Sequence, residues 1–204
     1  HEVLELPSGN LLTLSTETRD YDNYPSSESD PSEPKSQASI VGDIVVEFPR
    51  SGTIVRESKL LDILDPYRFG YNSLSGGFWR EAYSALAKNR LVDWAHTNSV
   101  VYDAESETYL LSQKHQDALV KLDARSGRIQ WILGHHANWR KPWRRHLLHP
   151  RGELQWPYRQ HAAMWTTAGT VLVFDNGTYR AAPFDEKRPA AESYSRAVEY
   201  AIDE

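Results

Sequence analysis

Short apolar runs separated by polar turns recur along the chain and predict antiparallel β-hairpins. Residues 1–14 hold two such runs around a Pro-Ser-Gly-Asn turn, and residues 161–174 repeat this layout. In both copies the turn glycine lies eight residues after a histidine, His1 or His161. A third copy opens with His96 and turns at the same distance. The self-similarity indicates a repeat architecture in which each hairpin begins with a histidine.

A second hairpin follows each of these. Residues 43–56 and 118–131 share an Arg-Ser-Gly turn, and residues 196–204 match the first strand of the same unit. Two consecutive hairpins make a four-stranded antiparallel sheet, which is the blade of a β-propeller, with its inner strand facing a central channel. We therefore expect an all-β fold with about three propeller blades and short helical insertions.

The expected organisation is a single partial propeller without separate domains. It consists of a blade over 1–58 with a flexible acidic insertion at about 18–40, a helical insertion over 59–92, a blade over 93–134, a basic Trp-rich loop over 135–158 and an incomplete blade over 159–204. In the helical insertion, Phe78, Tyr83 and Leu86 lie at helical spacing, so they are expected in the core or as a covering surface.

Composition narrows the classes of protein. The chain has 204 residues, of which 40% are hydrophobic and 25% charged, as in globular proteins. No apolar run approaches the ~20 residues of a membrane-spanning helix. The chain lacks cysteine, which excludes disulfides and thiolate sites, and its net charge of −5 disfavours a nucleic-acid partner. It begins with His1 instead of Met, so a processed or cropped N-terminus is expected and the compartment stays open.

The charges are distributed unevenly. Residues 17–33 hold six acids and one Arg, and are rich in Ser and Pro, which is typical of a flexible surface segment. Residues 124–152 hold seven Lys or Arg and no acid, and tryptophans interleave with the cations between 139 and 145. Aromatic and cationic side chains together can form a wall that receives anions.

If the hairpins are equivalent, His1, His96 and His161 converge on one axis. Asn98 would share the face of His96, because residues i and i+2 of a strand point the same way, and Lys114 would bring a cation to the same mouth. A single histidine at such a position is commonly a hydrogen-bonded strand-end residue. Three histidines at equivalent positions of three hairpins favour a functional site instead.

Three chemistries suit this cluster. Three imidazoles could hold zinc, although Lys114 would repel a metal ion and no carboxylate lies at an equivalent position. A neutral imidazole could instead act as a nucleophile toward a sulfuryl or phosphoryl group, with the other side chains as donors to its oxygens. The channel could also bind without chemistry.

The remaining histidines are weaker candidates. The pairs 135/136 and 146/149 have the spacing of metal ligands, but the basic residues around them disfavour zinc. His115 is expected to be packed or hydrogen-bonded, on the face opposite Lys114. Asn176, in a Phe-Asp-Asn-Gly turn, is a candidate for the channel wall.

Several motifs together resemble the bacterial arylsulfate sulfotransferases, over essentially the whole chain. They are Asp93-Trp-Ala-His96-Thr-Asn98-Ser, Leu111-Ser-Gln-Lys114-His115-Gln, Trp131-Ile-Leu-Gly134, Gln160-His161-Ala, Phe174-Asp-Asn-Gly177 and Tyr194-Ser-Arg-Ala-Val-Glu-Tyr200. The resemblance implies a six-bladed propeller, usually exported to the periplasm. It also implies transfer of a sulfuryl group from a phenolic sulfate ester to an acceptor phenol without a nucleotide sulfate donor, a metal or an organic cofactor.

The same resemblance assigns roles to residues. It places the transiently sulfated histidine at His161, with His96, Asn98 and, through a hairpin match alone, His1 as further active-site residues. Trp94 and Trp165 would stack on aryl rings or belong to blade cores. The implied partners are therefore a small aryl sulfate donor and a phenolic acceptor, with neither nucleic acid nor membrane.

The chain departs from the family pattern in three respects. Lys114 stands where the family commonly has Arg, and an ammonium cannot make the forked contact of a guanidinium. The disulfide found near the site in some relatives is absent, since the chain lacks cysteine. The length provides about half a ring, so more chain exists, or this is a fragment, or copies assemble into a homo-oligomer. The alternative function is a non-catalytic propeller module or an inactive fragment.

Overall fold

The computed structural model describes residues 2–83, 85 and 87–203, which form three mainly antiparallel sheets with short helical turns between them. The first sheet contains β1 (Leu4–Glu5), β2 (Leu11–Tyr24), β3 (Ser36–Phe48) and β4 (Arg56–Lys59) in that order, and β5 (Arg90–Asp93) pairs in parallel with β3. The second contains β6 (Thr97–Asp103), β7 (Thr108–Gln113), β8 (Ala118–Asp123) and β9 (Ile129–Gly134). The third contains β10 (His161–Trp165), β11 (Val171–Asp175) and β12 (Arg196–Tyr200).

Helical structure is confined to short pieces. They are α1 (Leu60–Ile63), α2 (Trp79–Tyr83) and the 3₁₀ turns η1 (Ser73–Ser75), η2 (Lys114–Gln116), η3 (Trp143–His146) and η4 (Ala190–Glu192). The expectation of an all-β protein is confirmed. No helix among the described residues has the length and apolar character needed to cross a membrane.

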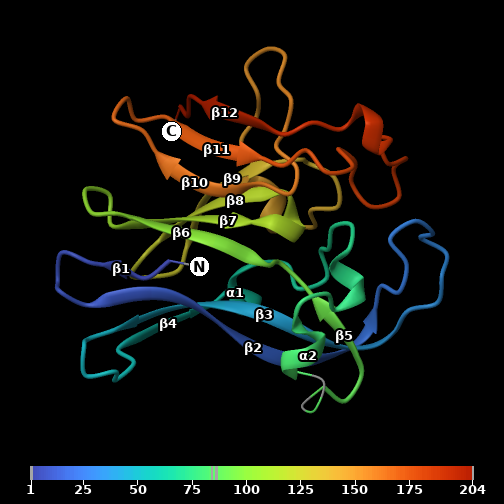
Figure 1. The fold of residues 1–204 in the computed structure, drawn as a ribbon, viewed down its shortest axis with the longest axis horizontal. Coiled ribbons are helices and arrows are strands. Elements are labelled where there is room, and N and C mark those ends of the chain that lie inside the picture. The colour runs from blue at the N-terminus through green and yellow to red at the C-terminus, as the bar shows by residue number, and fades with distance from the viewer. Residues whose placement is uncertain (1, 84, 86, 204) are drawn as a thin grey trace.

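The second sheet lies between the other two, as Figure 1 shows. Its strands are apolar on both faces, because alternate residues pack in opposite directions. Leu111 and Val120 belong to the core shared with the first sheet, whereas their neighbours Leu110 and Leu119 belong to the core shared with the third. The burial of every residue of β7 follows from this central position.

The acidic segment differs from the flexible insertion expected at about 18–40. Residues 18–24 and 36–40 extend the β2–β3 hairpin, and the connecting segment covers 25–35. Beyond its short pairing with β1, β2 lies at the edge of its sheet. Charged side chains on an edge strand oppose pairing with another chain, so polar residues are compatible with a strand here. The many charged residues of this segment had led to the prediction of a flexible insertion instead of a strand.

The helical insertion is mostly loop. Phe78 is exposed at 72%, which contradicts its assignment to a core, and Leu86 lies outside the described residues. The Tyr83 hydroxyl makes a hydrogen bond with the Thr16 hydroxyl. Other apolar residues of this segment do enter the core of the protein, among them Leu60, Leu64 and Leu74.

A buried ion network joins the last two strands and the loop between them. Asp175, which is fully buried, accepts a hydrogen bond at 2.8 Å from the Arg196 Nε and lies 3.1 Å from the Arg180 Nη2. Replacing Asp175 by alanine leaves the buried Arg180 guanidinium without this carboxylate. We therefore expect Asp175→Ala to lower the free energy of unfolding by about 3–5 kcal/mol, measured by denaturant titration.

The matched control is Asp203→Ala, which removes the ion pair between the exposed side chains of Asp203 and Arg151. Exposed pairs contribute about 0–1 kcal/mol, so this variant should unfold close to the wild type. Equal losses in the two variants would contradict the importance of the buried network.

Candidate active site

His161 occupies the first position of β10, where the strand is irregular. The pairing with β11 shifts register between His161 and Met164, and Ala162 has a φ of 53°. A bulge of this kind re-aims the side chains next to it. The His161 Nδ1 lies 2.9 Å from the Asn176 Oδ1 and 3.2 Å from the Arg159 carbonyl oxygen. Because a carbonyl only accepts, Nδ1 carries the proton in this arrangement, and Nε2 keeps its lone pair.

His96 precedes β6 in a left-handed backbone conformation, with a φ of 50°. Residues without glycine's freedom that adopt this conformation often belong to functional sites. Its Nδ1 lies 2.6 Å from the Oδ2 of Asp93, the last residue of β5. The imidazole is 17% exposed, whereas Asp93 is 2% exposed, so the ring extends from a buried carboxylate toward the surface.

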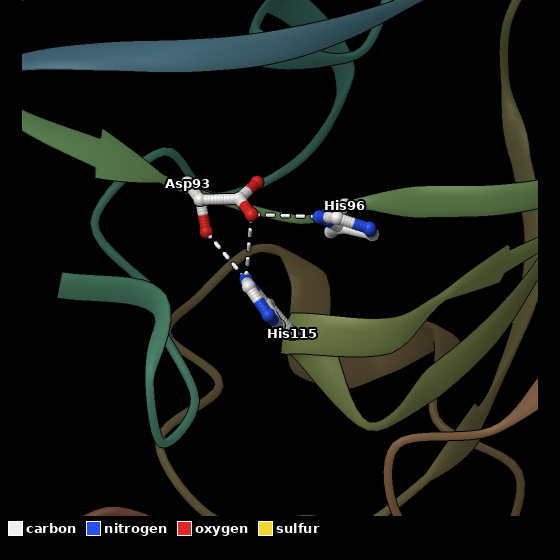
Figure 2. Close-up of side chains that lie close together, drawn as sticks. All are labelled: Asp93, His96 and His115. Carbon is white, nitrogen blue, oxygen red and sulfur yellow. Dashed lines mark hydrogen bonds and ion pairs between the residues drawn. The ribbon is translucent and has the colours of Figure 1, made fainter. Parts of the chain in front are cut away.

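Asp93 also organises a second imidazole, as Figure 2 shows. The His115 Nδ1 donates to the Asp93 carbonyl oxygen at 2.6 Å, and the Trp79 Nε1 donates to the Asp93 Oδ1 at 3.1 Å. Burial, with a smaller contribution from the Arg159 charge, lowers the pKa of His115 to about 3. His115 is therefore neutral near pH 7, and it is buried and hydrogen-bonded, as the sequence had suggested.

The Asn98 side chain contacts the segment before His161. The pairing of β6 with β7 shifts register between Thr97 and Ser99, and His96 lies before the strand, so the rule of alternating faces does not relate the two side chains. The buried Asn98 Nδ2 donates to the Gln160 carbonyl oxygen at 2.8 Å. This bond ties the start of β6 to the residue before His161.

Lys114 begins η2, directly after β7. Burial, followed by repulsion from the Arg159 charge, lowers the pKa of its half-buried ammonium. The Arg159 Nη1 donates to the Lys114 carbonyl oxygen at 3.4 Å. Asn98 and Lys114 are thus both linked to the segment that leads into His161. His1, the fifth residue assigned from the sequence, lies outside the described residues.

The sequence analysis did not single out three residues of this region. Asp93 lies in a motif quoted for the family resemblance, where its spacing of three from His96 was the available signal. Gln160 and Arg159 precede His161 and are both buried. Gln160 lies in the quoted motif Gln160-His161-Ala, but the local pattern does not show that either residue is buried, because their partners lie more than forty positions away.

Two other expectations changed. Trp94 is completely buried, with its Nε1 donating to the Asp65 carbonyl oxygen, so it belongs to the core and does not offer a stacking face. In the basic loop, Trp139 is buried under the Arg68 guanidinium, and the Arg140 guanidinium binds the Asp65 carboxylate. These side chains fasten the loop to residues 65–68 and are already engaged within the protein.

Among the residues that the structure describes, the one group with the composition of a metal site is Asp93, His96 and His115. Both Nδ1 atoms lie at hydrogen-bond distance from oxygens of Asp93, so a metal ion would have to displace two N–H donors. The positive charge of Arg159 acts on His115 and would oppose a further cation. This donor set fits hydrogen bonding better than metal coordination. The histidine pairs 135/136 and 146/149 form no such group.

These features define an all-β protein in which the imidazoles of His96 and His115 gather at the buried carboxylate of Asp93, while His161 begins the third sheet. The chain belongs to the arylsulfotransferase (ASST) family, whose model matches residues 1–204.

Two relatives carry the name arylsulfate sulfotransferase AssT. The protein of Escherichia coli is 29% identical over 243 aligned positions, covering 100% of this chain and 38% of the relative. That of Lelliottia amnigena is 30% identical over 205 positions, covering 80% of this chain and 33% of the relative. The chain therefore spans little more than a third of the length of these curated relatives.

The low pKa of His115 has a measurable consequence for stability. The unfolded chain binds a proton at His115 below its ordinary pKa of about 6.5, whereas the folded protein does so only near 3, so acidification between these values favours unfolding. His115→Gln should remove this component. Between pH 7 and pH 4, we expect the wild type to lose about 3 kcal/mol more of its unfolding free energy than the variant loses.

The contribution of Asp43 to the free energy of unfolding changes with pH in the opposite sense. Burial raises the pKa of Asp43 to about 6, so its protonation on acidification favours folding. Both proteins retain Asp43, so the difference between them isolates His115. Denaturant titrations at the two pH values give the four free energies. Parallel losses in wild type and variant would show that the buried imidazole does not stay neutral.

Proposed function

We propose that this chain is part of a β-propeller enzyme, six-bladed as in its family, that transfers a sulfuryl group from an aryl sulfate to an acceptor phenol through a sulfated His161. The observation that carries the proposal is the pair of acceptors around the His161 Nδ1, the Arg159 carbonyl and the Asn176 amide oxygen. Together they select the tautomer whose Nε2 can act as a nucleophile. The family membership and the names of the relatives support the reaction class.

The reaction proceeds in two displacements. The Nε2 lone pair of His161 attacks sulfur, an N–S bond forms, and the S–O bond to the aryl group breaks, with its electron pair leaving on the phenolate oxygen. In the second step an acceptor phenol oxygen attacks sulfur, the N–S bond breaks, and its electrons return to Nε2. The acceptor loses one proton and the leaving phenolate gains one, and we assign His96 to carry it.

Charge develops on the departing phenolate and on the sulfuryl oxygens, and donors that meet this charge lower the barrier. The charge of Arg159, two residues before His161, acts on the Lys114 ammonium, which we assign to this role. Its lowered pKa reflects desolvation, and a partly desolvated cation interacts more strongly with an anion than an exposed one does. Asn98 helps to hold the backbone before His161.

The open arrangement of the sheets agrees with a partial propeller. The second sheet is a complete four-stranded meander, and the third has three strands. Further blades would close the ring and cover the exposed faces. By the same family argument we expect export to the periplasm, small phenolic donors and acceptors, and no nucleotide sulfate donor.

The covalent intermediate is directly testable. Brief incubation of the protein with an aryl sulfate, without an acceptor, should add one sulfuryl group to His161, located by peptide mass spectrometry. The His161→Ala variant should take up no label and should transfer no sulfuryl group. His149→Ala, which removes an exposed histidine of the basic loop, should label as the wild type does.

Two outcomes would contradict this proposal. Turnover that requires added metal and stops with a chelator would indicate a metal-assisted reaction. Binding of the aryl sulfate without label or turnover would indicate the non-catalytic binding module.

Lys114 provides a second test. Lys114→Ala removes a cation from the developing oxyanion and should lower the rate of transfer by about 10²–10³-fold, as for other single donors. Lys114→Arg keeps the charge and adds forked donors, so it should preserve or raise the rate. Lys35→Ala, at an exposed loop position, is the control. Initial rates with one donor–acceptor pair decide the matter, and an unchanged rate in Lys114→Ala would remove this residue from the site.

A further inference from the structure

We propose that Asp93 is a positioning residue that holds the His96 imidazole with its proton on Nδ1, so that Nε2 exchanges protons with the phenolic oxygens of donor and acceptor. The inference rests on the proposed sulfuryl transfer and adds to it the residue that gives His96 its role. It begins from a buried acid whose oxygens contact three side chains.

The carboxylate is fixed before it meets His96. Asp93 ends β5, which pairs with β3 at Val41, and the next residue, Trp94, donates its backbone N–H to the Val41 carbonyl at 3.3 Å. The Trp79 indole donates to the Asp93 Oδ1. The Oδ2 atom then lies 2.6 Å from the His96 Nδ1. The acid therefore sets the position of the ring, since its own position is defined by the sheet and by an indole.

Hydrogen bonds also fix the backbone around the His96 imidazole. The His96 carbonyl accepts from the Lys114 N–H at 3.4 Å, and the Ala95 carbonyl accepts from the His115 N–H at 2.8 Å. These bonds join the turn before β6 to η2 after β7. They place His96 in the left-handed conformation that turns its ring toward the Asp93 carboxylate. Such a strained position persists only where its surroundings determine it.

The hydrogen bond determines the tautomer. An ionised carboxylate only accepts, so the proton of the neutral ring lies on Nδ1 and the lone pair on Nε2. In the first displacement a protonated His96 gives its Nε2 proton to the leaving phenolate oxygen. In the second, Nε2 takes the proton of the acceptor phenol. The Nδ1–H bond to Asp93 remains through both transfers. Between them the ring is neutral, and the imidazolium present before the first transfer and restored by the second lies against the negative charge of Asp93.

Several other charged and titratable groups surround this pair. His115 lies 5.1 Å from His96 between ring centroids and is neutral, for the reason given above. Asp43 contacts the backbone N–H and hydroxyl of Thr97, at 3.0 and 2.9 Å. The charge of Arg159 acts on His115 and on the Lys114 ammonium, and the Lys114 ammonium also interacts with the Asp93 carboxylate. The contact that defines the pair is the hydrogen bond between the Asp93 Oδ2 and the His96 Nδ1, at 2.6 Å.

The test compares two neighbouring buried carboxylates. Asp93→Asn replaces the acceptor by an amide whose NH₂ can donate to Nδ1, which would move the proton of His96 to Nε2. We expect transfer to fall within the range of about 10²–10⁴-fold that general acid–base catalysis contributes. The matched control is Asp43→Asn, which also removes a buried carboxylate near His96 but leaves the Asp93 contact, and should stay close to the wild type.

Two measurements separate positioning from a merely structural effect. The first is the rate of His161 sulfation by unsubstituted phenyl sulfate relative to 4-nitrophenyl sulfate. A poorer leaving group depends more on proton donation, so Asp93→Asn should slow the phenyl ester much more than the nitrophenyl ester. The second is the ¹⁵N NMR signature of the His96 ring, which should report Nδ1–H in the wild type and in Asp43→Asn, and Nε2–H in Asp93→Asn.

The outcomes distinguish this inference from the reaction itself. Absence of label on wild-type His161 would refute the sulfuryl transfer, whereas the NMR signature would still test the hold of Asp93 on His96. Labelling in the wild type together with an unchanged leaving-group ratio and tautomer in Asp93→Asn would overturn the positioning role. A stoichiometric metal ion bound by the wild type and lost in Asp93→Asn would overturn it too, because Nδ1 would then be a ligand.

Discussion

The buried amide of Gln160 holds the third sheet against the second, and the placement of the candidate site depends on it. Its Nε2 donates to the carbonyls of Gln113 and Ala118 at 3.1 and 2.9 Å, and the backbone carbonyl of Gln160 accepts from the Asn98 Nδ2. Unpaired buried polar groups are costly, so these bonds favour one registration of the two sheets. His161 follows directly in the chain, and its position relative to β6 and η2 is fixed in consequence.

The same region concentrates buried charge at the ends of strands. Asp93 and Asp175 lie at strand ends, and Asp117 lies in the turn between β7 and β8. Each contacts N–H groups of another segment, for example the Arg159 N–H at 2.8 Å from the Asp117 Oδ1. A buried carboxylate is tolerated only with such partners, so each one constrains the segment it contacts. The loops that carry the imidazoles are therefore held by polar contacts as well as by apolar packing.

Some of the strands were predictable from the local pattern of apolar residues and turns. The apolar runs around Gly9, Gly127 and Gly169 located strands near their observed positions, because a two-residue period and a turn glycine are local properties. The acidic strand β2 was missed, since its charges suit an edge that only the sheet order reveals. The alternation rule does not apply at Asn98, because the register shifts there and His96 lies before the strand, and its side chain donates to the Gln160 carbonyl oxygen.

The sequence by itself determined that the chain is built from antiparallel hairpins, that histidines lie at the start of two described strands, and that it resembles a family of sulfotransferases. The tertiary structure decided which atoms those histidines present. Hydrogen bonds to the oxygens of Asp93, Asn176 and the Arg159 carbonyl select the ring nitrogen that carries the proton. The partners lie three, fifteen and two residues away along the chain, so the backbone conformation at each histidine decides whether these contacts form. A tautomer is therefore a property of the folded site and has no local signature in the sequence.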